Sequence, residues 1–275
     1  MKKIPFSVAM CVYGGDKPEW FDEALTSVTE QTVKPDEIVL VVDGPVPESI
    51  RNVIEKHKAT FGNLNAVYLT ENVGHGNARR KSLENCKYNL VALMDADDIC
   101  VENRFEQQLA IFASSPDVSI VGGNINEFID SADNVVGKRI VPQNDSAIKE
   151  YLKRRCPFNQ MTVMFKKEDV YAAGGYVDWY CNEDYYLWLR MFEKSSRFAN
   201  TGTVLVNARV GKEMYQRRGG LRYFKSEAKL QKYMYDKKII GFLTYTTNVM
   251  KRLIVQVLLP NKIRGFVFRK FAREK

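Results

Sequence analysis

Histidine is scarce in this chain, and cysteine never occurs in a close pair. The 275 residues include two histidines and five cysteines, none of them spaced as Cys-x-x-Cys. Structural and catalytic zinc sites are usually assembled from such pairs or from several histidines. The sequence therefore argues against a zinc protein. Because the number of cysteines is odd, we expect free thiols and a reducing, cytosolic environment.

Long apolar segments are also lacking. The longest apolar run near the C-terminus, Leu253–Leu259, is too short to cross a bilayer and follows the charged pair Lys251-Arg252. The first residues include Lys2 and Lys3 but no long apolar stretch before Gly14, so we expect no signal peptide. The chain is long enough for one large α/β domain with a substantial core.

Charge is distributed unevenly along the chain. From Arg209 onward there are 18 Lys and Arg residues against four Asp and Glu, whereas the first 208 residues carry 23 basic and 29 acidic side chains. The basic segment is rich in Tyr, Phe and Leu, a composition typical of a peripheral anchor on an anionic membrane. Binding to nucleic acid and a solvated helical face are alternative interpretations of the same charge.

Apolar strands alternate with amphipathic helices in the first half of the chain. We expect strands at Phe6–Val12, Ile38–Val42, Ala66–Leu69, Leu90–Met94, Val118–Val121 and Met161–Phe165, and helices from about Pro18, at Glu48–Lys58 and at Asn77–Asn85. This alternation predicts an α/β fold with a parallel sheet covered by helices on both faces. Such sheets bind ligands beyond the C-terminal ends of their strands.

Three carboxylates follow the buried strand that ends at Met94. Asp95, Asp97 and Asp98 repel one another and resist burial unless a cation or hydrogen-bond donors neutralise them. Oxygen ligands suit Mg²⁺ or Mn²⁺, which usually keep positions open for substrate phosphates. Capping of the next helix would explain one aspartate but not three. We therefore expect a metal-assisted reaction on a nucleoside diphosphate.

A second acidic pair, Glu183-Asp184, stands at the start of an apolar helix. A capping role is one interpretation, because the helix dipole favours negative charge at this end. The other interpretation is a general base that takes the proton from an attacking hydroxyl. The residues alone leave both open.

Taken together, these motifs resemble the family 2 inverting glycosyltransferases, which have the Rossmann-like GT-A fold. Among them the chain is most similar to bacterial exopolysaccharide and O-antigen transferases of the amylovoran type. The matching segments are Ser7–Tyr13, Gln31-Thr32, Pro35–Ile38, Val42–Pro45, Asn72–Arg79, Met94–Asp98, Asn182–Tyr185, Leu187–Arg190 and Arg217–Gly220. The resemblance implies a mostly parallel sheet flanked by helices, followed by a basic helical C-terminal extension.

The resemblance also implies roles for individual residues. Tyr13 would pack on the uracil, Asp43 would accept from its N3–H, and Asn72 would lie in the same donor site. Arg79 would lie near the diphosphate or base, and Asp95 would contact the ribose or phosphate. The remaining roles are metal binding by Asp97 with support from Asp98, general base catalysis by Asp184 with help from Glu183, and binding of an acceptor diphosphate by Arg217, Arg218 and Arg222.

The implied reaction moves a hexose, galactose or glucose, from a UDP-sugar to a GlcNAc- or GalNAc-diphospho-polyprenol, with Mn²⁺ or Mg²⁺ as cofactor. By resemblance the linkage would be β-1,3, and the product would serve O-antigen, capsule or exopolysaccharide synthesis. The chain departs from the family pattern at Pro45, where Ser is common, and at Gln160, where many relatives have His. It also lacks the Gln-x-x-Arg-Trp motif of processive synthases, which favours addition of a single sugar.

We expect a donor-binding half at residues 1–115, an acceptor half at 116–210 and a membrane-associating, acceptor-binding region at 211–275. The protein would then lie on the cytoplasmic face of the bacterial inner membrane as a peripheral enzyme that does not bind nucleic acid. Two alternatives are a sugar-phosphate nucleotidyltransferase and a non-enzymatic basic module that binds membranes or nucleic acid. The first lacks its usual glycine-rich phosphate loop after the first strand, and the second leaves both acidic clusters unexplained.

Overall fold

Four parallel strands form the N-terminal half of the sheet. The computed structural model describes residues 4–211 and 219–260. Strands β1 (Phe6–Tyr13), β2 (Glu37–Asp43), β3 (Leu64–Tyr68) and β4 (Leu90–Met94) lie in the order β3-β2-β1-β4. Each neighbouring pair is parallel, so the C-terminal ends of the strands share one edge. The predicted α/β fold is confirmed.

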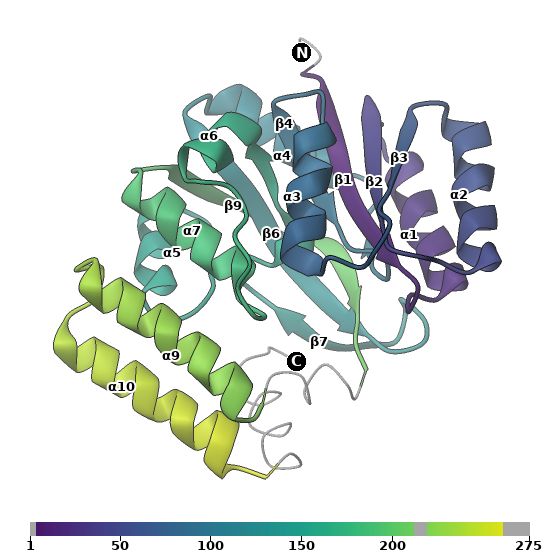
Figure 1. Ribbon diagram of the computed structural model, residues 1–275. Coiled ribbons are helices and arrows are strands. Elements are labelled where there is room, and N and C mark those ends of the chain that lie inside the picture. The colour runs from purple at the N-terminus through teal and green to yellow at the C-terminus, as the bar shows by residue number, and fades with distance from the viewer. Residues whose placement is uncertain (1–3, 212–218, 261–275) are drawn as a thin grey trace.

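Alternate side chains of β1 point to opposite faces of the sheet and belong to two different apolar cores. Val8 and Met10 belong to the core that also contains Phe21 and Ile50, whereas Ala9 belongs to the core on the other face. The first core is covered by α1 (Pro18–Thr29), α2 (Glu48–Phe61) and α4 (Arg104–Ser114), and the second by α3 (His75–Asn85) and later helices. Figure 1 shows α3 in front of the sheet and α1 and α2 beside and behind it.

The remaining strands extend the sheet beyond β4. They are β5 (Ile99–Cys100), β6 (Val118–Phe128), β7 (Val135–Arg139), β8 (Met164–Lys166) and β9 (Arg197–Arg209), in the order β4-β8-β6-β9-β5 with β7 paired to β6. β8 is antiparallel to both of its neighbours, while β9 is parallel to β6. This half of the sheet is therefore mixed.

The strand that we expected at Met161–Phe165 is only partly correct. Residues Gln160–Thr162 form a 3₁₀ turn, η1, and β8 begins at Met164. The hydroxyl of Thr162 donates to the carbonyl of Asn159 (2.7 Å) and accepts from the backbone of Gly123 (3.1 Å). These bonds pair backbone groups of Asn159 and Gly123 with the Thr162 side chain, so the apolar residues around the turn do not form one continuous strand.

Helices of the second half cover the same face as α3. They are α5 (Asp145–Leu152), α6 (Lys167–Ala172) and α7 (Glu183–Glu193). Trp188 of α7 is fully buried and its ring meets those of Phe158 and Phe165. α7 is thereby fixed on the sheet with its N-terminus directed toward α3 (Figure 1).

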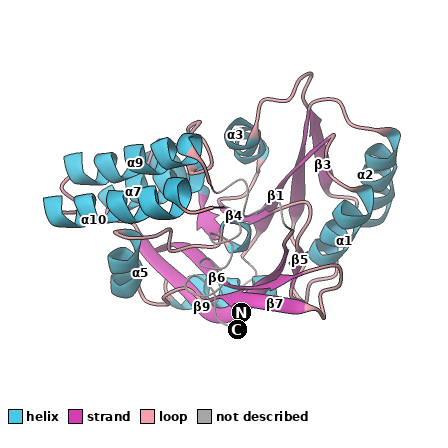
Figure 2. Ribbon diagram, turned by 90° about the horizontal axis from the view of Figure 1, so that it is seen from below, coloured by secondary structure: helices cyan, strands magenta, loops and turns pink. Residues whose placement is uncertain are grey.

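Two helices follow the sheet domain. They are α9 (Leu221–Asp236) and α10 (Phe242–Leu253), and α10 continues into a π-helical turn, η2 (Ile254–Leu258). Leu230 and Met234 of α9 belong to the same core as α7, and in Figure 2 the three helices lie together on one side of the sheet. Within the described ranges, every helix is too short or too polar to span a bilayer.

Candidate active site

Polar side chains gather where the parallel strands end. Tyr13 closes β1 and Asp43 closes β2, and the two residues are partners in the strand register. Asp95 directly follows β4, the other neighbour of β1. The structure therefore brings the predicted donor-site residues of three separate strands to one edge of the sheet.

Asp43 organises the loop that follows β3. Its two carboxylate oxygens accept hydrogen bonds from the backbone nitrogens of Val73 (2.7 Å) and Gly74 (3.2 Å), and the amide of Asn72 donates to its carbonyl (3.3 Å). Gly44 has a φ of +85°, and a Cβ there would lie 2.7 Å from the nitrogen of Asn72. Asp43 and Asn72, both predicted donor-site residues, are thus tied together.

Tyr13 offers an aromatic face beside this loop. Its side chain is 46% exposed, and its ring lies so close to Gly15 that a Cβ at that position would be 2.5 Å from the ring. The backbone nitrogen of Tyr13 donates to the carboxylate of Asp16 (3.0 Å). The ring is therefore packed against the turn after β1 while nearly half of the residue stays exposed to solvent, where a base could contact it.

Arg79 joins the two acidic clusters that the sequence identified separately. Its guanidinium is buried and donates to Asp95 (Nη2 to Oδ1, 3.0 Å) and to Glu183 (Nη1 to Oε1, 2.7 Å). Burial alone would lower the pKa of Arg79, but the negative charges of Asp95 and Glu183 outweigh it and raise this pKa. The end of β4 and the start of α7 therefore face one site.

Glu183 and Asp184 have different surroundings. Glu183 packs beside Gly76 at the start of α3, and burial raises its pKa although the positive charge of Arg79 opposes this. Asp184 is half-buried, with one carboxylate oxygen 3.9 Å from the Sγ of Cys156. Burial, with a further contribution from the charge of Asp184, raises the pKa of Cys156 to about 12, so this thiol stays protonated and can donate weakly.

Asp98 has a structural contact that the sequence did not indicate. It is buried, and its Oδ1 accepts from the backbone nitrogen of Arg209 (2.8 Å) at the end of β9. The side chain of Arg209 in turn donates from Nε to the carbonyl of Asp97 (3.1 Å). Burial and the charges of Asp97 and Asp95 raise the pKa of Asp98. Asp98 and Arg209 together hold the acidic loop against β9.

Asp16 is a candidate site residue that sequence reasoning missed. Burial, followed by the negative charges of Asp97 and Asp95, raises its pKa to about 6 although the backbone of Tyr13 donates to it. Its position in the loop just after β1 was the available signal, because that loop ends at the same edge as Asp95. Carboxylates from two strand ends thus converge there.

The carboxylates at this edge suit a divalent cation that is completed by a substrate. In the described part of the chain, no three Asp, Glu, Cys or His side chains lie close enough to form a full metal-binding group. Mg²⁺ and Mn²⁺ are commonly held by one or two carboxylates together with substrate phosphates. The negative charges of Asp95 and Asp97 repel those of Asp16 and Asp98. A cation at this point would relieve that repulsion.

Tyr176 is a buried residue near both the acidic pair and η1. Its buried hydroxyl accepts from Nε2 of Gln160 (3.1 Å). Burial raises the pKa of Tyr176. The positive charge of Arg79 opposes this increase, and the negative charges of Asp184 and Glu183 add to it. The phenol therefore stays protonated beside the candidate base.

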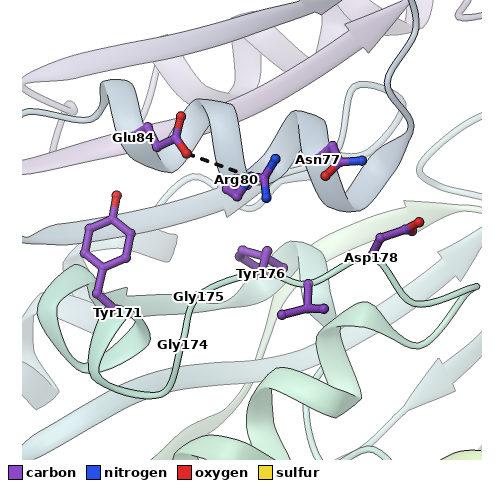
Figure 3. A pocket seen from close by; sticks show the side chains of 9 residues that line it. Asn77, Arg80, Glu84, Tyr171, Gly174, Gly175, Tyr176 and Asp178 are labelled. Atoms are coloured by element: carbon purple, nitrogen blue, oxygen red, sulfur yellow. Dashed lines mark ion pairs between the residues drawn. The ribbon is translucent and has the colours of Figure 1, made fainter.

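A cavity of about 500 Å³ borders this region along the outer side of α3. Asn77, Arg80 and Glu84 of α3 line one wall, and the loop after α6, including Tyr176 and Asp178, lines the other (Figure 3). Asp178 also lies near Gly76, so the cavity adjoins the point where α3 meets α7.

The predicted acceptor arginines are only partly described. Arg217 and Arg218 lie outside the described residues. Arg222, in the first turn of α9, is exposed and its guanidinium lies 4.0 Å from the centre of the Tyr180 ring. This cation–π contact positions Arg222 in front of the loop that leads into α7.

Comparisons with known proteins agree with this geometry. Residues 7–174 match the family model described as "Glycosyl transferase family 2". The chain is 37% identical to the amylovoran biosynthesis glycosyltransferase AmsE of Erwinia amylovora, over 96% of this chain and 98% of that protein. It is also 37% identical to an Escherichia coli UDP-Gal:alpha-D-GlcNAc-diphosphoundecaprenol beta-1,3-galactosyltransferase, over 98% of this chain and 96% of that protein.

A solved structure shows the same fold. The chain aligns with S. aureus TarS residues 1–349 in complex with UDP-GlcNAc with a TM-score of 0.65 at 15% identity, covering 91% of this chain and 73% of that one. At this identity the likeness concerns the fold alone. It supports the GT-A prediction, in which helices flank a sheet with a parallel N-terminal half.

Proposed function

The chain belongs to glycosyl transferase family 2, and from this we propose that it transfers galactose or glucose from a UDP-sugar to a GlcNAc- or GalNAc-diphospho-polyprenol. The proposal includes inversion at the anomeric carbon, a β-1,3 linkage and a role in bacterial surface polysaccharide synthesis. Relatives named for a UDP-galactose and a UDP-glucose β-1,3-transfer to GlcNAc-diphosphoundecaprenol support the substrate class. The observation that carries the mechanism is the double ion pair of Arg79, because it joins both acidic clusters at one site.

The donor nucleotide would lie over the ends of β1 and β2. Tyr13 would stack on the uracil, and Asp43 would accept from the N3–H through lone pairs that its bonds to Val73 and Gly74 leave available. Asn72, fixed to Asp43, would form the rim of the same site. Asp95 and Arg79 would face the ribose and diphosphate.

Asp97 is the proposed metal ligand, and Asp98 supports it from the interior through its bond to Arg209. A bound Mn²⁺ or Mg²⁺ supplies positive charge for the departing UDP. Arg79 would contribute further positive charge at the same diphosphate if it turned from Asp95 toward the ligand, and its buried position would shield that interaction from water.

Asp184 is the proposed general base. Burial raises the pKa of Glu183, but its Oε1 already accepts from Nη1 of Arg79 at 2.7 Å, so taking up a proton would weaken this ion pair. Asp184 would take the proton of the acceptor hydroxyl as that oxygen forms a bond to C1 of the sugar, while the bond between C1 and the diphosphate breaks and UDP leaves. Attack from the face opposite UDP converts an α-linked donor into a β-glycoside.

We further propose that residues 1–115 bind the donor, 116–210 contribute to the acceptor site, and 211–275 bring the protein to the acceptor at the membrane. The enzyme would then act as a peripheral protein on the cytoplasmic face of the inner membrane. The family match favours this function over nucleotidyl transfer and over a non-enzymatic binding module.

A direct assay tests the proposal. The purified chain is incubated with Mn²⁺, a GlcNAc-α-diphospho-lipid and each of several UDP-hexoses, and products are followed by mass spectrometry. We expect one added hexose from UDP-galactose or UDP-glucose, and NMR should show a β-anomeric signal. An absence of transfer from every UDP-hexose to both GlcNAc and GalNAc acceptors, with either metal, would contradict it.

A further inference from the structure

The last helix of the described residues, α10, buries polar side chains on its inward side and exposes apolar ones on its outward side. Asn248 of α10 is buried, and its amide donates to Gln231 of α9 (2.8 Å) and to the carbonyl of Lys153 (3.0 Å). Gln256 of η2 is also buried and donates to Glu227 (3.1 Å). These polar contacts, together with Tyr245, which packs against the core shared with α7 and α9, attach α10 to the protein.

The outward side carries a row of large apolar residues. Leu243 is 79% exposed, and Met250, Ile254 and Leu258 are also exposed at spacings of seven, four and four residues, so they lie along one side of the helix. Phe242 extends the row at its N-terminal end. We call these five residues the outer row. An exposed apolar row of this kind usually marks an interaction surface.

Charge around the outer row identifies its partner. Lys251 is exposed on α10, and Lys225 and Lys238 are exposed on and just after the neighbouring α9. The following sequence, 261–275, has six basic residues and one acidic residue. A second copy of this chain, or the chain's own basic C-terminal sequence, would bring like charges together, whereas an anionic lipid surface would attract them.

We propose that the outer row inserts into the headgroup boundary of an anionic bilayer while the neighbouring lysines contact lipid phosphates. α10 would lie parallel to the membrane, because its inward side is fixed to α9 and its outward side is apolar along its length. In Figure 1, α10 lies on the margin of the molecule, and α9 separates it from α7. The inference extends the proposed function, since a polyprenol-linked acceptor is itself held in such a bilayer.

The test compares two full-length variants. The first changes Leu243, Met250 and Ile254 to Ser, and the control changes Val135 and Val136 of β7, which are also exposed apolar residues, to Ser. Both keep every basic residue. We expect the outer-row variant to bind vesicles of phosphatidylglycerol and phosphatidylcholine at least tenfold more weakly than wild type, and the control to bind normally. Because the substituted side chains are exposed, thermal melts should stay unchanged.

Activity separates this inference from the proposed function. The outer-row variant should transfer normally to a short-chain, water-soluble acceptor analogue but poorly to a long-chain acceptor in vesicles. If neither the wild type nor the outer-row variant transfers a sugar to the soluble analogue, the proposed function fails, while vesicle binding still tests the role of the outer row. Unchanged vesicle binding by the variant overturns the inference. The inference is also overturned if the variant keeps vesicle binding but loses self-association in sedimentation experiments, because a second copy of the chain would then be the partner.

Discussion

Asp95 and Glu183, at the end of β4 and the start of α7, accept hydrogen bonds from one guanidinium, that of Arg79. The arrangement holds Asp95 and Glu183, the acid next to the candidate base, on the two amino groups of one buried cation. It explains how α7, which follows the mixed half of the sheet, is aligned with strand ends of the parallel half. In the proposed mechanism the same cation would also serve the donor diphosphate, which would couple donor binding to the position of α7.

Replacing Arg79 by Ala should destabilise the fold by about 3–5 kcal/mol, because it leaves the largely buried carboxylates of Asp95 and Glu183 with uncompensated charges. Urea unfolding measures this loss. The matched control is Arg80→Ala on the same helix. Arg80 is exposed, and its ion pair with Glu84 is long, with 3.8 Å between Nε and Oε1. Its removal should therefore cost about 0.5 kcal/mol or less.

A double variant sharpens this prediction. Adding Glu183→Gln to Arg79→Ala removes one of the unpaired charges, so part of the lost stability should return. Equal losses for the Arg79 and Arg80 variants would mean that the double ion pair contributes little to the fold.

Asp184→Asn should leave UDP affinity unchanged and reduce turnover by about 10²–10⁴-fold, since the amide cannot accept the acceptor's proton. Isothermal titration and steady-state kinetics separate the two quantities. Glu183→Gln is the informative comparison, because it should lower stability by weakening the bond to Arg79 while retaining more activity. If the two variants exchange these phenotypes, Glu183 is the base.

Much of the sheet followed from local pattern, whereas its later strands did not. The runs Phe6–Val12 and Ile38–Val42 are apolar and end at polar loops, which predicted buried parallel strands. β9 was not expected, because Arg197–Arg209 mixes Asn, Thr and Gly202 with its apolar residues and has no clean period of two. Its long pairing with β6 supplies the order that the local sequence does not.

The site was predictable in its parts but not in its connections. The acids at 95–98 and 183–184 are visible because carboxylates are unusual next to buried strands and apolar helices. The partner of Glu183 is 104 positions away, and only the fold determines that distance in space. The hydrogen bond that Asp98 accepts from the backbone of Arg209 and the approach of Asp16 to Asp97 and Asp95 depend on the same long-range packing.

Asp97→Ala should remove most Mn²⁺-dependent affinity for UDP, at least about tenfold, because the cation would lose a protein ligand while the diphosphate oxygens remain. Titration of UDP with Mn²⁺ and again with EDTA measures the difference. Asp133→Ala, which removes a carboxylate from the exposed turn between β6 and β7, is the control and should bind as wild type does. Retained metal dependence in the Asp97 variant would move the metal site elsewhere.

Gly44→Ala should weaken donor binding and the fold together. Gly44 has a φ of +85°, and the added Cβ would lie 2.7 Å from the backbone of Asn72. The loop that Asp43 holds would have to move, and we expect a loss of about 1–3 kcal/mol in unfolding free energy with a raised KM for the UDP-sugar.

Gly62→Ala separates backbone strain from that contact. Its φ of +75° is similar, but nothing lies within 4 Å of the added atom. This variant should show the cost of the left-handed conformation, about 1 kcal/mol, with an unchanged KM. If both glycine variants raise KM equally, the contact between Gly44 and Asn72 does not shape the donor site; if only Gly44→Ala does, the loop after β3 is part of the nucleotide site.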